Sequence, residues 1–166
     1  LVSGEIDIYA EYTGTLTHEI FAQNNPASNA ALRELLAESG LVMSEPLGFR
    51  DNFALGMREP IAERLKIRRI SDLRAHPELV FRFGTEFTER DDGWPGLRLH
   101  YGLPQQDVLG VEHDLAYRGL AAGDVDLTDL YTTDAEIAYY SLRTLEDDLG
   151  YFPPYEAILL YRAELA

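Results

Sequence analysis

The sequence predicts an α/β protein built as two lobes, and three observations lead to this prediction. Short apolar strand patterns alternate with amphipathic helix patterns along the chain, which is typical of βαβ units around mainly parallel sheets. One phrase is written twice, as GEIDIYAEYTGT at residues 4–15 and as GDVDLTDLYTTD at 123–134. The length of 166 residues suits one domain of ordinary size or two small lobes.

The two copies of the phrase align at an offset of 119 (131 − 12). In each copy a glycine, Gly4 or Gly123, follows a helical pattern where a positive φ is expected, and a short strand then closes on Tyr-Thr. Ligands of open α/β sheets collect at the carboxyl ends of the strands, so the repeat predicts two similar lobes that face one ligand. Coincidence remains the alternative, because such a phrase is a common connection between a helix and a strand.

The first third of the chain carries two helix patterns and one strong strand pattern. A helix is expected over residues 15–23, and Asn24-Asn25-Pro26 ends it. A second helix is expected over 30–39, with apolar residues on one face and Gly40 as its stop signal. The apolar run at 53–58 is too short for a helix and predicts a strand.

The remaining elements follow the same alternation. Pro60 is expected in the first turn of a helix that runs through Leu65, and Ser71 is expected to cap a short helix that Pro77 ends. The later pattern predicts a strand at 79–84, a helix ending at Tyr101, a strand at 107–111, a helix at 113–122, a helix at 135–140, and strands at 142–145 and 156–162.

The two lobes are expected to be unequal. Residues 51–155 contain enough elements for a complete lobe 2, whereas 1–50 and 156–166 supply only part of lobe 1. Eight apolar residues of the partial lobe are therefore expected to be short of partners: Ile6, Ile8, Leu32, Leu35, Leu36, Ile158, Leu159 and Leu160. This predicts either a homodimer that completes the lobe by exchanging elements or a poorly ordered first lobe.

Composition excludes several classes of function. The net charge of −15 argues against a nucleic-acid partner and is compatible with a cationic or zwitterionic ligand. The chain has no cysteine, and its four histidines show no metal-binding spacing, so neither thiol catalysis nor a metal site is expected. No phosphate-binding or dinucleotide-binding motif is present, so no cofactor is expected.

Two acidic clusters, DVDLTD at 124–129 and EDD at 146–148, are the strongest candidates for catalytic groups. They could supply the two carboxylates of a glycoside hydrolase, but residue spacing does not specify the separation of the carboxylates. Such residues more often flank strands and form turns. We therefore expect a protein that is not an enzyme, with an α/β hydrolase as a weaker alternative.

Three tyrosines, Tyr12, Tyr131 and Tyr155, lie at predicted strand ends among Gly, Pro and Thr. Aromatic faces that converge on one point hold a quaternary ammonium group, because the negative face of each ring attracts the cation. Arg90 lies in the turn-rich loop TERDDGWPG, where it either grips a ligand carboxylate or pairs at the surface with Asp91 or Asp92. Asp51 has a similar ambiguity between a turn residue and a ligand contact.

Several phrases together resemble the substrate-binding proteins of osmoprotectant ABC importers, which take up glycine betaine, choline and carnitine. The phrases are GEIDIYAEYTGT, FRDNFALGMR, RFGTEFTERDDGWPGLRLHYGL, GLAAGDVDLTDLYTTDAEI and LEDDLGYFPPYEAILLYR, in the order of the family. The resemblance implies a periplasmic-binding-protein-like type II clamshell, with one complete α/β lobe and part of the other. It also implies that the N-terminal strand and the C-terminal helices of the family have no counterpart here.

The resemblance assigns roles to individual residues. Tyr12, Tyr131 and Tyr155 match cage tyrosines of the family, and Thr15 matches a contact to the ligand carboxylate. The chain has phenylalanine, Phe53, where relatives often have tyrosine, so the ring face is kept and the hydroxyl is lost.

Two charged residues complete the set. Asp51 matches an acidic residue at the crossing between the lobes, and Arg90 matches the arginine that clamps the ligand carboxylate. The function implied is capture of a quaternary ammonium osmoprotectant outside the cytoplasmic membrane and its delivery to an ABC permease. A regulatory module that senses a ligand with the same fold is the alternative.

Overall fold

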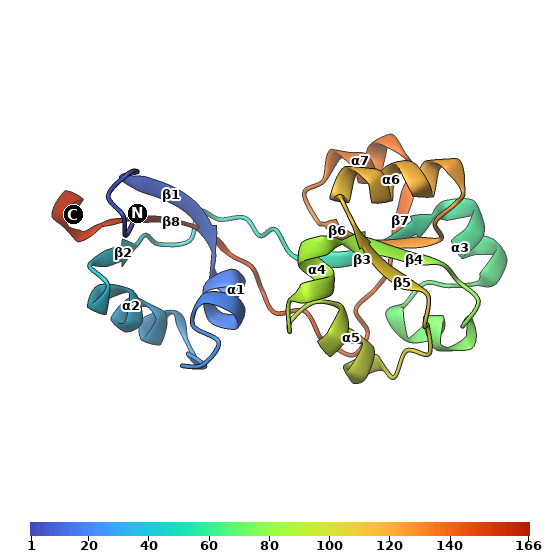
Figure 1. Cartoon of the computed structure of the whole chain (residues 1–166), viewed down its shortest axis with the longest axis horizontal. Helices are drawn as coiled ribbons and strands as arrows, with labels where there is room; N and C mark the ends of the chain where they lie inside the picture. The colour runs from blue at the N-terminus through green and yellow to red at the C-terminus, as the bar shows by residue number, and fades with distance from the viewer. The chain divides into compact units, whose positions relative to one another are not determined.

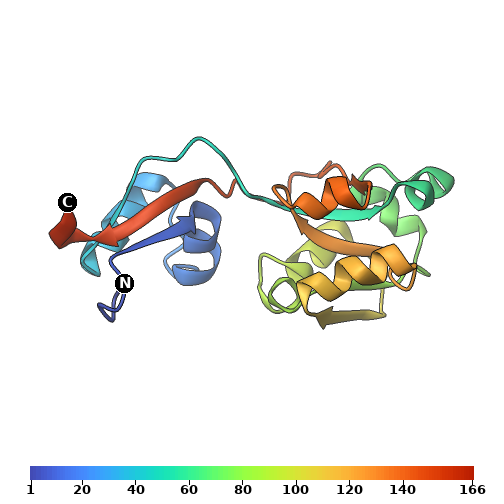
Figure 2. The same ribbon diagram turned by 90° about the horizontal axis from the view of Figure 1, so that it is seen from above.

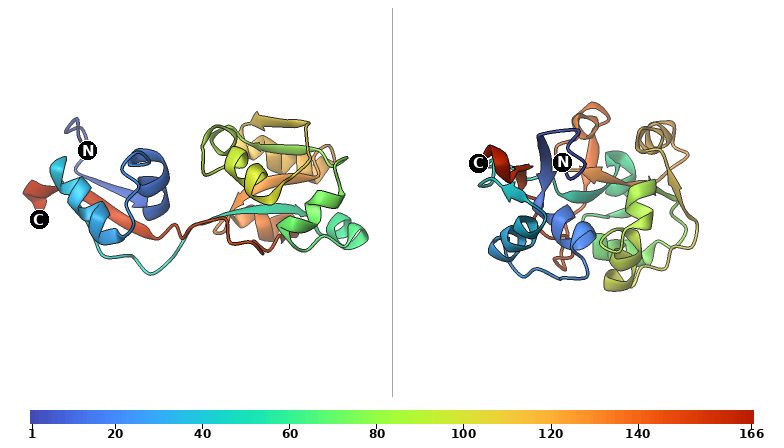
Figure 3. Two further views of the ribbon diagram at one scale, coloured as in Figure 1. Left: turned by 90° about the horizontal axis from the view of Figure 1, so that it is seen from below. Right: turned by 60° about the vertical axis from the view of Figure 1, so that its left-hand side comes forward.

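A computed structural model describes residues 1–166 and divides them into two compact units (Figure 1). Unit 1 comprises 1–51 and 153–166, and unit 2 comprises 52–152. The chain passes twice between the units, at 51–52 and at 152–153, and both segments are visible in Figure 3. No helix in either unit has the length and apolar character needed to cross a membrane.

Unit 1 consists of three strands and four short helical segments. The strands are β1 (Ile8–Tyr12), β2 (Leu41–Met43) and β8 (Ala157–Arg162). The helical segments are α1 (Thr13–Thr15), the π-helical turn η1 (Leu16–Ile20), α2 (Asn29–Glu38) and the 3₁₀ turn η3 (Ala163–Leu165). Ser28 caps α2, because its side chain accepts a hydrogen bond from the backbone N–H of Ala31 at 3.2 Å.

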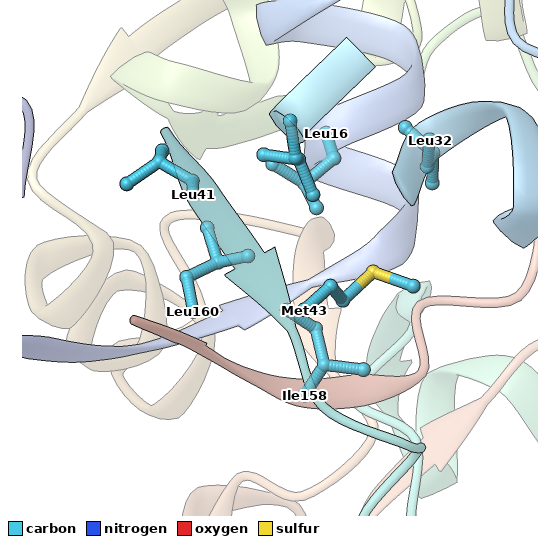
Figure 4. Packing of buried hydrophobic residues seen from close by; sticks show 7 residues of the cluster. Leu16, Leu32, Leu41, Met43, Ile158 and Leu160 are labelled. Carbon is cyan, nitrogen blue, oxygen red and sulfur yellow. The ribbon is translucent and has the colours of Figure 1, made fainter. Parts of the chain in front are cut away.

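The sheet of unit 1 has the order β1-β8-β2, and both pairings are antiparallel. The last strand of the chain therefore lies between two strands from its beginning, and Figure 2 shows β8 beside β1. Seven residues from the helical segments and the sheet form one buried cluster, shown in Figure 4: Leu16, Leu32, Leu36, Leu41, Met43, Ile158 and Leu160.

This core corrects part of the expectation that the apolar residues of the first lobe lack partners. Four of the eight, Leu32, Leu36, Ile158 and Leu160, are buried, because β8 brings the end of the chain under α2. Leu35 and Leu159 are half-buried, and the expectation holds at Ile6, just before β1, and at Ile8 in β1, which are 47% and 57% exposed.

Unit 2 alternates strands and helices. Its strands are β3 (Phe53–Arg58), β4 (Phe81–Gly84), β5 (Val108–Val111), β6 (Leu127–Tyr131) and β7 (Leu142–Thr144). Its helices are α3 (Glu59–Leu65), η2 (Ile70–Ala75), α4 (Thr85–Glu89), α5 (Trp94–Tyr101), α6 (His113–Ala122) and α7 (Ala135–Tyr139).

The sheet of unit 2 is mixed, with the order β5-β4-β6-β3-β7. β4 pairs in parallel with β5 and β6, whereas β3 pairs antiparallel with β6 and β7. Together with the antiparallel sheet of unit 1, this makes the prediction of mainly parallel sheets wrong. Strand direction depends on pairing between distant segments, which local patterns do not report.

Helices cover both faces of the unit 2 sheet, and Figure 1 shows α6 and α7 on one side and α4 and α5 on the other. On the first side, Tyr117 and Leu120 of α6 pack against Leu130. On the second side, the rings of Phe81 and Phe83 lie 5.7 and 5.2 Å from that of Trp94. Burial on both faces fits the apolar character of β3, β4 and β6.

Several predicted elements differ from the observed ones where tertiary contacts decide. The helix expected at 15–23 begins earlier and turns into the π-helical η1 after three residues. Ser71 is not a cap: it lies inside η2, and its hydroxyl donates to Asp148 at 2.6 Å. The strand β2 was not predicted, because three residues carry little periodicity and the strand exists through its pairing with β8.

Candidate functional site

The two copies of the repeated phrase form equivalent strands that each end on a tyrosine. β1 spans residues 8–12 and β6 spans 127–131, which are the same positions at the offset of 119 (8 + 119 = 127). The glycines before them, Gly4 and Gly123, have φ of 78° and 88°, so the prediction of a left-handed residue is confirmed in both copies. Tyr12 and Tyr131 therefore occupy matching strand ends, one in each unit.

In unit 1 the structure brings Tyr12, Asp51 and Tyr155 together. The carboxylate of Asp51 lies near the hydroxyl of Tyr12, and the pKa of Tyr12 is raised, first by burial and then by the negative charge of Asp51. The backbone N–H of Asp51 donates to the carbonyl of Tyr155 at 3.0 Å. Thr15 is the last residue of α1 and is partly exposed.

Tyr155 is held closely by its neighbours. Its side chain is buried, with the residue only 2% exposed. Thr13 binds the chain on both sides of it, because the hydroxyl of Thr13 donates to the carbonyl of Pro154 at 3.2 Å and accepts from the N–H of Glu156 at 3.1 Å. The sequence indicated Tyr155 through its Pro-rich context, and the structure shows a fixed backbone at this position.

In unit 2 an aromatic cluster surrounds Phe53. Its ring centroid lies 5.1 Å from those of Phe87 and Tyr131, and 6.3 Å from that of Phe152. Phe53 and Tyr131 are direct partners in the β3–β6 ladder, which explains their contact. Sequence reasoning missed Phe87 and Phe152, although Phe152 shares the FPPY context that singled out Tyr155.

Arg90 belongs to the same cluster, but not as a surface residue. It is only 7% exposed, and its guanidinium binds Asp92 through two hydrogen bonds of 2.8 and 2.7 Å. A third bond of 3.0 Å runs from Nη1 to Glu86, and the guanidinium carbon lies 5.6 Å from the centre of the Phe53 ring. The alternative of a surface ion pair is therefore right about the partner, Asp92, and wrong about the location, because Arg90 is buried.

Glu86 connects Arg90 to Tyr131. One oxygen of Glu86 accepts from Arg90, and the other accepts from the hydroxyl of Tyr131 at 3.4 Å. Burial is the largest cause that raises the pKa of Tyr131, and the charge of Glu86 is the next. Each tyrosine of the repeat thus has a carboxylate nearby, Asp51 for Tyr12 and Glu86 for Tyr131.

A cavity of about 180 Å³ opens beside Tyr131 at the carboxyl ends of β4, β5 and β6. Its lining residues are Gly84, Thr85, Glu86, Val111, Glu112, His113, Asp129 and Tyr131. Acceptor groups dominate this lining, so the cavity suits a cation or a hydrogen-bond donor better than an anion. Sequence reasoning missed His113, because no local spacing distinguishes it.

His113 lies between two carboxylates. Its Nδ1 is 3.5 Å from Asp129 and its Nε2 is 3.3 Å from Asp134. Asp134 also accepts from the hydroxyl of Tyr117 at 2.5 Å and from the backbone N–H of Tyr131 at 2.8 Å. Burial raises the pKa of Asp129, opposed by the hydrogen bond from the N–H of Gly84. No group of three His, Cys, Asp or Glu residues is arranged to hold a metal ion.

The acidic clusters considered as catalytic pairs mostly hold the backbone. Asp126 accepts from the N–H of Val80 at 2.9 Å. Asp147 accepts from the N–H groups of Tyr151 and Phe152 at 2.9 and 2.8 Å, and from the hydroxyl of Tyr101 at 2.5 Å. Carboxylates with these partners act as turn and loop anchors.

The chain is similar to known proteins over its full length. Residues 1–166 match the family described as the substrate binding domain of ABC-type glycine betaine transport system. The chain is 34% identical over 179 residues to a glycine-betaine-binding protein of Pseudomonas aeruginosa. It is 31% identical over 172 residues to an ergothioneine transport permease/ergothioneine binding protein of Helicobacter pylori.

These relatives are longer than the chain. The matches cover 98% and 99% of the chain, but only 58% of the Pseudomonas protein and 31% of the Helicobacter protein. Among solved structures, that of a glycine betaine/carnitine/choline ABC transporter superposes with a TM-score of 0.75 at 25% identity, over 99% of this chain and 63% of that one. This likeness confirms the α/β fold of the type II periplasmic-binding-protein class.

The family also bears on the prediction that the chain is not an enzyme. Its members are substrate-binding domains, which carry out no catalytic step, and the relatives at 31% and 34% identity are named for binding and transport. The match over residues 1–166 and the 34% identity to the Pseudomonas protein show the family. The chain belongs to the substrate-binding domains of ABC-type glycine betaine transport systems.

Proposed function

We propose that the chain is the ligand-binding part of an extracytoplasmic solute-binding protein that captures a quaternary ammonium osmoprotectant for an ABC permease. The observation that carries this proposal is the carboxylate near each repeat tyrosine: Asp51 near Tyr12, and Glu86 hydrogen-bonded to the hydroxyl of Tyr131. A carboxylate at the hydroxyl adds negative charge beside the ring, and an aromatic face already attracts a cation.

The proposed ligand contacts are Tyr12, Thr15, Asp51 and Tyr155 in unit 1, and Phe53, Arg90 and Tyr131 in unit 2. The internal repeat supports this division, because a duplicated strand end provides the same aromatic group twice. Each ring of such a cage contributes about 0.5–2 kcal/mol to binding of a desolvated cation.

Arg90 separates the candidate ligands by their second functional group. Glycine betaine and carnitine carry a carboxylate that a guanidinium can bind, whereas choline carries a hydroxyl. Asp92 holds the guanidinium of Arg90 in one orientation through two hydrogen bonds, so the arginine is pre-organised. The charge of Asp92 also offsets part of the attraction of Arg90 for a second carboxylate.

The relatives support the class of ligand and the transport role. They are named for glycine betaine in Pseudomonas aeruginosa, ergothioneine in Helicobacter pylori and carnitine in Listeria monocytogenes. We propose that this chain takes a ligand of the same chemistry and delivers it to a membrane permease on the outer side of the cytoplasmic membrane.

Calorimetry with glycine betaine, choline, carnitine, proline betaine and ergothioneine tests the proposal. At least one of them is expected to bind, and Tyr12→Leu and Tyr131→Leu are each expected to weaken its binding about 2-fold to 30-fold, the range for one ring. Tyr139→Leu is the matched control, because Tyr139 is 79% exposed and is not one of the proposed ligand contacts of unit 1 or unit 2. Absence of binding to all five ligands would refute the proposal.

A further inference from the structure

Gly14, in the middle of α1, lies directly against the ring of Tyr155. A Cβ atom added at Gly14 would be 2.2 Å from Cδ1 of the ring, 2.4 Å from Cε1 and 2.7 Å from Cγ. Non-bonded carbon atoms pack at about 3.5–4.0 Å, so no side chain fits between the helix and the ring. The ring is flat and rigid, and it cannot yield as the end of a flexible side chain could.

The backbone of Gly14 gives no reason for a glycine. Six glycines of the chain have a positive φ, and Gly14 is not among them. It lies in an α-helical turn, where alanine is favoured over glycine by propensity. The second copy of the repeat has threonine, Thr133, at the equivalent position (14 + 119 = 133), so the strand-and-turn unit forms without a glycine there.

Tyr155 has little freedom to move away from a side chain at position 14. Thr13 binds the carbonyl of Pro154 and the N–H of Glu156, and the N–H of Asp51 binds the carbonyl of Tyr155 itself. These bonds fix the backbone on both sides of the ring. A side chain at position 14 would therefore have to turn the ring out of its present orientation.

We propose that Gly14 is a positioning residue, which orients the ring of Tyr155 for ligand binding by leaving room for one of its faces. The inference rests on the proposed function, in which Tyr155 is a ligand contact. Gly14 lies directly against the ring, which is only 2% exposed, and so helps to set the direction of the ring. Thr13 anchors the backbone of residues 154–156, and Gly14 sets the direction of the Tyr155 side chain.

A double-mutant cycle of Gly14→Ala and Tyr155→Leu tests this role, because leucine can rotate away from a new methyl group. Binding of glycine betaine is measured by calorimetry, and stability by thermal unfolding. In the parent chain, Gly14→Ala is expected to weaken binding about 2-fold to 30-fold, the range for one ring, and to lower the unfolding temperature. In the Tyr155→Leu chain, the same change is expected to leave both quantities unaltered.

Gly119→Ala is the matched control. Gly119 is also helical with no left-handed φ, and its added Cβ would lie 2.5 Å from Cγ2 of Val125, which is not among the proposed contacts. This variant is expected to lower the unfolding temperature without changing the affinity. It separates a general loss of stability from a displaced ring.

Two results would overturn the inference. One is a Gly14→Ala variant with unchanged affinity and unfolding temperature, which would mean that the ring moves without cost. The other is an equal loss in the Tyr155 and Tyr155→Leu chains, which would mean that Gly14 does not act through the ring. If the parent chain binds no quaternary ammonium ligand, the proposed function fails, and the unfolding cycle alone then decides whether Gly14 and Tyr155 are coupled.

Discussion

Phe53 and Tyr131 face each other across the antiparallel pair of β3 and β6, with their ring centroids 5.1 Å apart. Phe53 also contacts Phe87 and Phe152 and lies under the guanidinium of Arg90. The buried ring of Phe53 thus contacts Tyr131 at the end of β6, Arg90, and Phe152 at the end of unit 2. Its replacement gives the first prediction.

Phe53→Leu is expected to weaken binding of a quaternary ammonium ligand more than it lowers stability. Leucine keeps most of the buried apolar volume, but it removes the ring face that supports Tyr131 and Arg90. Calorimetry and chemical unfolding measure the two effects, and Phe81→Leu in the same sheet is the control for lost aromatic packing. Equal loss of affinity in both variants would contradict a specific role for Phe53.

Arg90→Ala is expected to weaken glycine betaine binding about 10-fold or more and choline binding far less, because only betaine has a carboxylate for the guanidinium. Calorimetry measures both ligands on the same Arg90→Ala protein, so a general loss of folding would weaken both equally. Asp92→Asn is the control, since it breaks the ion pair and keeps the arginine. If betaine and choline lose the same affinity, Arg90 has a structural role.

Asp129 should make unit 2 less stable as the pH rises from about 4 toward neutral. Burial raises the pKa of its carboxyl in the folded state, so above the ordinary value the unfolded chain ionises first. The folded state then holds more protons, and its stability falls as pH rises toward the raised pKa. Asp129→Asn is expected to flatten this dependence in unfolding curves from pH 4 to 7.

The neighbours of Asp129 set the conditions of that measurement. His113 lies 3.5 Å away and opposes the shift when it is charged. A parallel series in the His113→Gln background separates the two groups. An unchanged pH dependence in Asp129→Asn would show that Asp129 is ionised in the folded protein at the same pH as in the unfolded chain.

Leu36→Ala is expected to destabilise unit 1 by about 2–5 kcal/mol, because it removes a buried side chain from the cluster of α2 and the sheet. Hydrogen exchange should report faster exchange at residues 158–160 and unchanged exchange at 127–131. Leu99→Ala is the control, since Leu99 is 85% exposed. Equal acceleration in both units would mean that the two units unfold together.

β1 is an edge strand of its sheet, and Ile8 and Tyr9 on it are 57% and 48% exposed. An exposed apolar edge favours pairing with another chain, so we expect a concentration-dependent homodimer through β1. Ile8→Lys is expected to reduce the dimer in light scattering, whereas Leu109→Lys on β5 should not. A monomer at all concentrations, with residues 8–12 as protected from exchange as 127–131, would contradict this expectation.

The sequence alone determined the features that depend on short segments. The repeat at an offset of 119 predicted two strands that each end on a tyrosine after a left-handed glycine, and both are present. The strand at 53–58 and the helix at 113–122 have the predicted bounds. These features follow from local rules, since periodicity and the freedom of glycine at positive φ act within a few residues.

Only the tertiary structure decided how distant segments pair and which charges meet. β8 lies between β1 and β2 and pairs antiparallel with both. In the second sheet, β3 pairs antiparallel with β6 and β7. The burial of Arg90 beside Asp92, and the position of His113 between two carboxylates, likewise depend on packing. Strand direction and desolvation are set by contacts between segments far apart in the chain, and no local pattern encodes them.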